Sequence, residues 1–165
     1  MTLASTFIDE LTREAATTRR VLERVPEDKL SWRPHAKSMS LGQMALHVAQ
    51  TPGAVANLIS ELRAQPPQFN QGEAASRSEL LSALDQSVAG AQDKLAAWGD
   101  RGLMEEWTLE REGKTLMALP RVGMVRSIML NHWYHHRGQL LVYLRLLDVP
   151  VPSVYGPSAD ENPFA

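Results

Sequence analysis

The sequence predicts an all-α protein, a four-helix bundle with one small hairpin between the third and fourth helices. Four stretches repeat apolar residues every three or four positions, which is the helical period, and capping or proline signals stand at their ends. The chain has 165 residues, 44% of them hydrophobic and 22% charged, which suits a single domain spanning 1–165. Amphipathic helices of similar length bury their apolar stripes against one another, so a bundle is the simplest architecture.

The first two helices are expected in the amino-terminal half of the chain. An apolar stripe covers 3–25, and Pro26 ends it because proline cannot continue a helix. A second stripe covers 40–62 and opens at Ser40 with a capping-box pattern. Pro52 lies inside this second helix, where we expect it to produce a kink.

The third and fourth helices follow a connector rich in proline and polar residues. The third covers 76–98, begins with another capping-box pattern and is expected to end at Gly99. The fourth covers 120–147 and starts with a proline, a residue favoured in the first turn. Between them, the runs 107–111 and 114–117 flank a Glu-Gly pair and predict a small hairpin.

Charge and composition exclude several classes of function. Seventeen Lys and Arg residues against nineteen Asp and Glu residues leave a net charge of −2, which gives no electrostatic basis for binding nucleic acid. The absence of cysteine excludes disulfides, thiolate metal sites and a cysteine nucleophile, so nitrogen or oxygen must hold any metal. Charged residues interrupt every apolar stretch and no signal peptide is visible, so we expect a cytoplasmic protein without a membrane segment.

Three histidines on the predicted helices form the candidate site. His132 and His136 stand four residues apart within the apolar stripe of the fourth helix, where both rings can turn toward one cation. His47 lies at the edge of the apolar face of the second helix and can reach the interior. The His132–His136 pair alone, or His47 alone, could also be buried imidazoles that bond to polar neighbours. The three histidines together favour a metal site.

Other residues near these histidines receive structural interpretations. His135 points away from His136 and is expected at the surface or behind the ligands, and His35 is expected in a loop. Arg137 is expected to be solvated or paired, and Gly138 to allow a close backbone approach. Five aromatic residues are expected to line a pocket or to pack in the core or an interface: Trp32, Trp107, Trp133, Tyr134 and Tyr155.

Three segments of the chain resemble one known family. Leu46-His47, the stretch 131–140 (NHWYHHRGQL) and the tail 151–161 are similar to the DinB-like (YfiT-like) family of proposed metalloenzymes. The resemblance implies an up-down-down-up bundle, frequent homodimers and a divalent ion held by one histidine of helix two and an HxxxH pair of helix four. It thus implies a metal site formed by His47, His132 and His136. The family includes thiol-dependent transferases and isomerases.

The histidines and the resemblance lead to a hypothesis of function. Three imidazoles leave a metal position open to water or substrate, which is typical of catalytic sites. Zinc is the first expectation, with nickel, iron or manganese as other candidates, and Asp160 and Glu161 are left outside the ligand set. The sequence therefore predicts a metal-dependent transferase or hydrolase that acts on a small electrophilic molecule, without assigning a catalytic acid or base. Any thiol must be a low-molecular-weight cosubstrate, since the chain has no cysteine.

Two alternatives remain open at this point. A non-enzymatic bundle could use the ion for stability or as a stress-response sensor, with its fourth metal position blocked. A metal-free cluster of histidines could instead respond to pH in the core or at a dimer interface. Measuring the metal stoichiometry distinguishes the metal-free cluster from the metal-binding bundle. Turnover of electrophiles distinguishes an enzyme from both.

Overall fold

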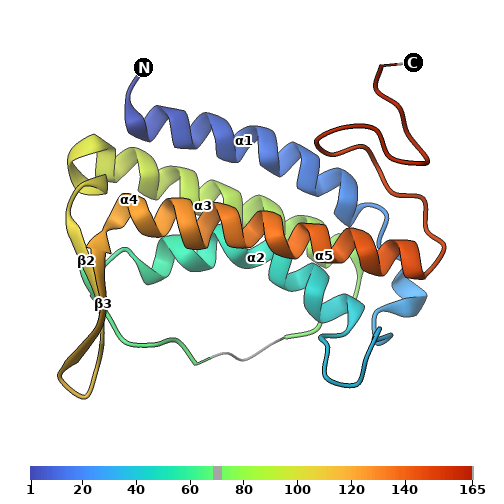
Figure 1. The fold of residues 1–165 in the computed structure, drawn as a ribbon, viewed down its shortest axis with the longest axis horizontal. Coiled ribbons are helices and arrows are strands. Elements are labelled where there is room, and N and C mark those ends of the chain that lie inside the picture. The colour runs from blue at the N-terminus through green and yellow to red at the C-terminus, as the bar shows by residue number, and fades with distance from the viewer. Residues whose placement is uncertain (69–71, 165) are drawn as a thin grey trace.

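Most of the chain forms long helices that lie side by side, with a small sheet at one end of them (Figure 1). The structure is a computed structural model, and it describes residues 1–68 and 72–164. Within these ranges the α-helices are α1 (Leu3–Leu22), α2 (Leu41–Leu58), α3 (Arg77–Leu103), α4 (Arg121–Met124) and α5 (His132–Leu146). A 3-10 turn, η1, covers Glu27–Lys29, and a π-helical segment, η2, covers Val125–Asn131 and joins α4 to α5.

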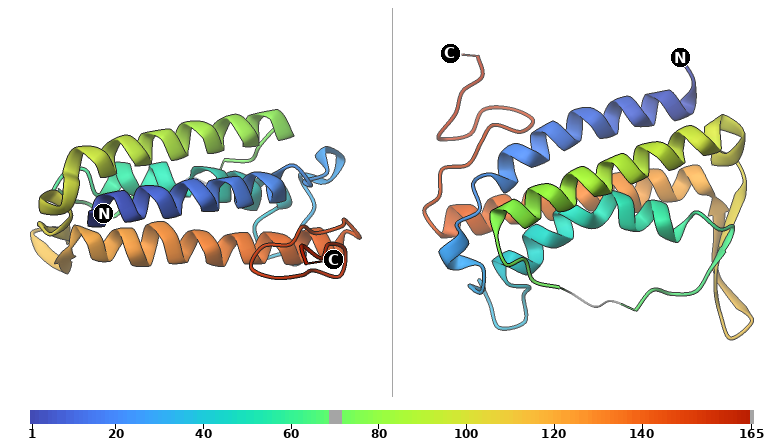
Figure 2. Two further views of the ribbon diagram at one scale, coloured as in Figure 1. Left: turned by 90° about the horizontal axis from the view of Figure 1, so that it is seen from above. Right: turned by 180° about the vertical axis from the view of Figure 1, so that it is seen from behind.

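The long helical segments run in two directions (Figure 1, Figure 2). α1 and the continuous α4–η2–α5 segment run one way, and α2 and α3 run the opposite way. α2 packs against α3 and α5, and α1 also packs against α3 and α5. Their apolar stripes meet in one core, whose largest buried side chains include Leu11, Leu41, Leu80, Trp107, Met129 and Trp133. None of the described helices combines the length and apolar character needed to cross a bilayer.

The capping-box pattern at the start of α2 is confirmed. The hydroxyl of Ser40 accepts a hydrogen bond from the Gln43 backbone N–H, and the Gln43 side-chain oxygen accepts one from the Ser40 N–H. The predicted end of this helix at residue 62 is wrong, because α2 stops at Leu58. The apolar pattern continues past the helix because Ile59 is buried in the core outside it.

The third helix differs from its prediction at the carboxyl end. Gly99 has φ of 54° and ψ of −171°, which interrupts the helical geometry, but α3 resumes and ends at Leu103. At the start of α3, Ser76 accepts a hydrogen bond from the Glu79 N–H, as the capping pattern predicts. The Glu79 carboxylate reaches Ala75 N–H instead of the cap residue itself. Gly99 therefore ends the regular helix, as predicted, and a short second helical segment continues beyond the kink to Leu103.

A three-stranded sheet corrects the all-α prediction. The predicted hairpin is confirmed as β2 (Glu106–Arg111) and β3 (Lys114–Pro120), with both turn residues at positive φ. A third strand that the sequence did not predict, β1 (Arg63–Ala64), pairs parallel with β2. β1 is only two residues long, too short to produce a β pattern in the sequence. The protein is thus mostly helical with a small sheet.

Candidate metal centre

Three histidines from two helices meet in the structure. His47 comes from α2, and His132 and His136 come from the first turns of α5. One ring nitrogen of each lies within 4.8 Å of the corresponding nitrogen of the others. The ring centroids are 5.3 Å apart for His47 and His132, 4.5 Å for His47 and His136, and 4.3 Å for His132 and His136. We call these three residues the histidine triad.

The spacing of His47 and His132 suits a common ion. The Nε2 atoms of His47 and His132 are 3.1 Å apart. Two nitrogens that each lie about 2.05 Å from one ion are about 2.9 Å apart at a right angle and about 3.3 Å apart at the tetrahedral angle. The observed separation lies between these two values. Within the described residues no carboxylate joins the triad, so three neutral nitrogen donors form the candidate ligand set.

Burial keeps the triad unprotonated at neutral pH. Burial, together with the positive charges that His47 and His132 could carry, lowers the pKa of His136 to about 4, although the hydrogen bond with Gln139 acts in the opposite direction. Burial also lowers the pKa of His47 and of His132, with smaller effects from neighbouring imidazoles. An imidazole binds a metal only through an unprotonated nitrogen, so these pKa shifts favour the ion-binding form.

A neighbouring amide fixes the orientation of His136. The Gln139 side-chain oxygen lies 2.7 Å from Nδ1 of His136. An amide oxygen can only accept, so Nδ1–H donates and Nε2 carries the free lone pair. Such outer partners orient histidine ligands and select the tautomer that binds metal. Residue type alone does not single out Gln139, although its position three residues after His136 on one helix places the two side chains on the same face.

A hydrogen bond to a carbonyl that a proline leaves free connects the two helices that carry the triad. Pro52 has no N–H, so the Val48 carbonyl four residues earlier has no helical donor. The indole N–H of Trp133 donates to this buried carbonyl at 2.8 Å. Val48 follows His47 directly and Trp133 follows His132 directly, so this hydrogen bond holds the two metal-binding positions opposite each other. Trp133 is a core residue, one of the roles that the sequence predicts for it.

A π-helical segment leads directly into the triad. η2 ends at Asn131, one residue before His132, where the sequence predicts an uninterrupted α-helix. Its side chains Met129 and Leu130 are buried in the core, and Ile128 is half-buried beside the site. Wide helical turns of this kind often occur at functional sites, and sequence periodicity does not reveal them.

The remaining predicted residues lie outside the triad. His135 is exposed, with its ring centroid 5.0 Å from that of His136, and His35 lies in the loop before α2. Arg137 is paired, as expected, but it is also almost fully buried. Among the described residues, no atom beyond its own helix approaches the Cβ position of Gly138 within 4 Å, so the predicted close approach there is wrong.

The acidic residues of the tail are engaged elsewhere. Asp160 pairs with the Arg145 guanidinium at the end of α5, and Glu161 accepts two hydrogen bonds from Arg20 at 2.5 and 2.6 Å. These ion pairs lower the pKa of both carboxyl groups. The tail thus attaches to α1 and α5 and contributes no ligand to the triad in the described structure.

Comparison with known proteins places the chain in a family. The family model described as the DinB family matches residues 1–163. The chain belongs to the DinB family. Two Bacillus subtilis proteins are related to it in sequence. The uncharacterized protein YrdA is 26% identical over 149 residues, covering 90% of this chain and 85% of YrdA. The uncharacterized protein YjoA is 27% identical over 133 residues, covering 78% of this chain and 80% of YjoA.

Solved structures of DinB-like proteins share the fold. A DinB-like protein from Bacillus cereus superposes with a TM-score of 0.71 at 22% identity, covering 93% of this chain and 98% of that one. The crystal structure of YjoA also gives a TM-score of 0.71 at 22% identity, covering 91% and 97% of the two chains. The DinB resemblance of the sequence is therefore confirmed, and the observed arrangement of helices is that of this family.

A cavity adjoins the histidine triad of this DinB family member. It has a volume of about 450 Å³ and runs along α2 and η2. His47 and His132 form part of its wall. The remaining lining residues described by the structure are Gln50, Thr51, Ala54, Val55, Leu58, Pro67, Gln68 and Ile128. A triad at the edge of a cavity can be reached by a small molecule, which a structural site closed by core packing does not permit.

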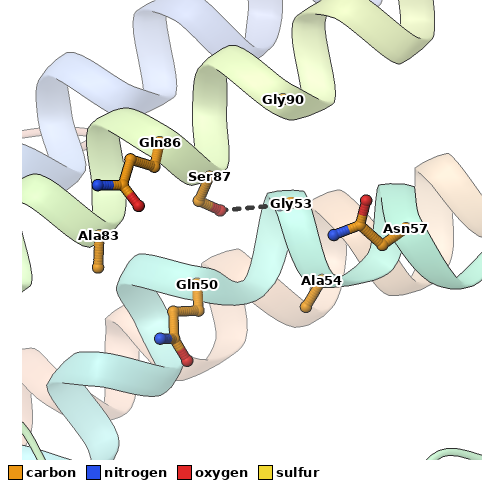
Figure 3. Close-up of a pocket in the computed structure, with 8 residues that line it drawn as sticks. All are labelled: Gln50, Gly53, Ala54, Asn57, Ala83, Gln86, Ser87 and Gly90. Carbon is orange, nitrogen blue, oxygen red and sulfur yellow. Dashed lines mark hydrogen bonds between the residues drawn. The ribbon is translucent and has the colours of Figure 1, made fainter.

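A second hollow lies between α2 and α3 and shares Gln50 and Ala54 with the first (Figure 3). It contains no histidine, and three of the side chains around it are the amides of Gln50, Asn57 and Gln86. Among its lining residues, Gly53 packs against Ser87, whose hydroxyl accepts the Gly53 N–H at 2.8 Å. We refer to the first space as the triad cavity and to this one as the amide hollow.

Proposed function

We propose that this DinB family protein binds a divalent metal ion through His47, His132 and His136 and catalyses a transfer or hydrolysis reaction on a small electrophilic molecule. One observation carries the proposal: the three imidazole nitrogens converge within 4.8 Å of one another at the wall of a cavity. The donor set is neutral and consists of three ligands. That number leaves at least one position on a four- or six-coordinate ion for a reactant.

The histidines would hold the ion, and the cavity would hold the reactant beside it. A bound divalent ion acts as a Lewis acid that lowers the pKa of a water or thiol at neutral pH. The chain itself keeps its donors unprotonated through burial, fixes the His136 ring through Gln139 and keeps α2 and α5 in register through Trp133. Imidazole donors suit zinc, which we propose first, and they also suit nickel and iron, with manganese as a further candidate.

The chemistry proposed is nucleophilic substitution. In the transfer reaction, the sulfur of a thiol forms a bond to the electrophilic atom, the leaving group departs with the electron pair of the broken bond, and the thiol proton passes to solvent. In the hydrolytic reaction, a water oxygen takes the place of the sulfur. The sequence contains no cysteine, so the thiol would be a low-molecular-weight cosubstrate.

Metal binding is tested first, with protein prepared without a histidine tag. We expect one divalent ion per chain by elemental analysis and by calorimetric titration of zinc into ion-free protein. His132→Ala should abolish this binding, whereas His135→Ala should leave it unchanged, because His135 is exposed and outside the triad. Saturating zinc should also raise the melting temperature of the wild type, because a ligand that binds only the folded state stabilises it. Substoichiometric zinc, or unchanged binding by His132→Ala, contradicts the proposal.

Catalysis is tested second, on protein loaded separately with zinc, nickel, iron or manganese. A panel of alkyl halides, epoxides and activated esters is offered with and without low-molecular-weight thiols. We expect turnover of at least one class by the loaded wild type and none by His132→Ala. Stoichiometric metal binding without turnover across the panel would instead favour a non-enzymatic metal-binding sensor.

A further inference from the structure

We infer that the triad cavity selects uncharged molecules with an apolar body and one polar atom directed at the histidine triad. This inference rests on the proposed function and specifies its substrate class. The triad forms one part of the cavity wall, and the rest of the wall determines what can lie beside it.

Five of the described lining side chains are hydrocarbon: Ala54, Val55, Leu58, Pro67 and Ile128. They come from α2, from the segment after β1 and from η2, so apolar groups face the cavity from three separate elements. Water in contact with such a wall is displaced favourably by an apolar ligand. The transfer of an apolar group from water into the cavity therefore lowers the free energy.

The remaining lining residues carry no formal charge once the triad is neutral. They are the amides Gln50 and Gln68 and the hydroxyl of Thr51. The Thr51 hydroxyl already donates to the His47 carbonyl at 2.6 Å, so it can offer a ligand only an acceptor oxygen. Among the described lining residues none is Lys, Arg, Asp or Glu, so a charged group on the ligand body would lose hydration without gaining an ionic partner.

The cavity volume limits the size of the ligand. About 450 Å³ lies in the lower half of the range for small-molecule sites, roughly 300–1,000 Å³. It is sufficient for a small molecule with a short alkyl chain or a ring and too small for a peptide-sized ligand in full. The amide hollow between α2 and α3 provides a natural comparison, since it is lined by amides and contains no triad residue.

The experiment uses three hydroxamates as probes, because a hydroxamate binds zinc and carries a variable substituent. Acetohydroxamate has a minimal body, hexanohydroxamate an apolar chain, and adipic monohydroxamate a chain that ends in a carboxylate. We expect zinc-loaded protein to bind hexanohydroxamate at least about tenfold more tightly than acetohydroxamate, since each buried methylene contributes about a fourfold gain. Adipic monohydroxamate should bind no more tightly than acetohydroxamate. Affinities are measured by isothermal titration calorimetry.

Two neighbouring residues provide a matched pair of variants. Of these two spaces, as the described residues form them, Leu58 lines the triad cavity and not the amide hollow, and Asn57 lines the amide hollow and not the triad cavity. Leu58→Trp should reduce the preference for hexanohydroxamate over acetohydroxamate at least fivefold, whereas Asn57→Trp should leave it unchanged. Leu58→Gln, which keeps a similar volume but adds an amide, should reduce the preference in the same direction. Zinc stoichiometry is measured for every variant as a check on the triad.

The outcomes separate this inference from the proposed function. Suppose that zinc binds stoichiometrically but that the hydroxamate affinity does not depend on chain length, or that adipic monohydroxamate binds as tightly as hexanohydroxamate. Either result overturns the inference and leaves the proposed metal site intact. Equal effects of Leu58→Trp and Asn57→Trp likewise overturn it. Failure to bind zinc overturns the proposed function and this inference with it.

Discussion

Gln139 is the single side chain outside the triad with the clearest expected effect on metal binding. It accepts the Nδ1–H of His136 at 2.7 Å and leaves Nε2 available for the ion. Gln139→Leu should weaken zinc binding about 10- to 100-fold, the usual effect of removing such an outer partner. Gln139→Glu retains an acceptor oxygen and should preserve most of the affinity. The measurement is competition with a chromophoric chelator.

A matched control for this prediction lies on α3. Gln86 is an exposed glutamine whose amide contacts Ser82, and Gln86→Leu should not change the zinc affinity. If Gln139→Leu binds zinc as tightly as the wild type does, the contact with His136 has no role in orienting the ring.

The histidine pKa shifts predict how the stability of ion-free protein depends on pH. The unfolded chain takes up protons on its histidines near pH 6.5, whereas burial lowers the pKa of His136 in the folded state to about 4. Below pH 6.5 the unfolded state therefore binds more protons, so the free energy of unfolding falls as the pH is lowered. The stability that the lowered pKa of His136 contributes is fully present above pH 6.5 and is lost as the pH falls toward 4.

Urea denaturation in the presence of a chelator measures this effect at pH 7 and pH 5. We expect the wild type to lose stability between these values, and His136→Gln, which cannot be protonated at this position, to lose less. An identical loss in the two proteins would show that His136 does not contribute to the pH dependence. The other histidines are present in both proteins and serve as an internal control.

At the level of secondary structure, the hydrogen bond between Trp133 and Val48 connects α2 to α5. Trp133→Phe keeps an aromatic ring but leaves the buried Val48 carbonyl without this donor, which should cost about 1–3 kcal/mol of stability. Pro52→Ala would return a helical N–H to the same carbonyl. Pro52→Ala should therefore be more favourable in the Trp133→Phe background than in the wild type. A double-mutant cycle by urea denaturation measures the difference.

Independent effects of the two substitutions would contradict this coupling. Leu140→Val, which shortens a buried side chain elsewhere on α5, provides a control that should show no coupling to Pro52→Ala. Zinc affinity measured in parallel should fall in Trp133→Phe, because α2 and α5 each carry part of the triad.

The sequence was sufficient for the features that depend on local patterns. Apolar periodicity located the long helices, the Ser40 cap is confirmed, and the Glu112-Gly113 turn of the hairpin is in place. The three candidate ligands converge, as predicted. Their convergence was predicted from helical spacing together with a family resemblance.

Features that depend on long-range contacts were not predicted. β1 forms because its two residues meet β2, more than 40 positions later, and no pattern in two residues signals this. The π-helical turns of η2 have the same residue preferences as an α-helix, so periodicity predicted an ordinary helix there. The role of Trp133 required knowledge of which carbonyl Pro52 leaves free and which side chain reaches it.

At the scale of the whole molecule, a buried ionic cluster ties α1, α5 and the tail together. Arg137 is almost fully buried, pairs with Glu14 at 2.7 Å and donates to the Tyr155 hydroxyl at 2.6 Å, which in turn donates to Glu14. Glu14→Ala would leave the Arg137 charge buried without its partner, which should cost about 3–5 kcal/mol. The measurement is the free energy of unfolding in urea at pH 7.

An exposed ion pair in the same region provides the comparison. Glu161 pairs with Arg20, and both side chains are more than a third exposed. Glu161→Ala should therefore cost only about 0–1 kcal/mol. Comparable losses for Glu14→Ala and Glu161→Ala would mean that the buried cluster is not a major source of stability.

The hydrogen bond from Trp133 to Val48 also affects how an ion would enter and leave the centre. Because this contact is made entirely by protein atoms, it would keep the triad donors near one another whether or not an ion is bound. Capture would then require little more than loss of the ion's hydration shell, and one metal could be exchanged for another without unwinding either helix. The metal found in the cell would accordingly reflect supply, and starvation for one ion would change the occupant while leaving the scaffold ready for its replacement.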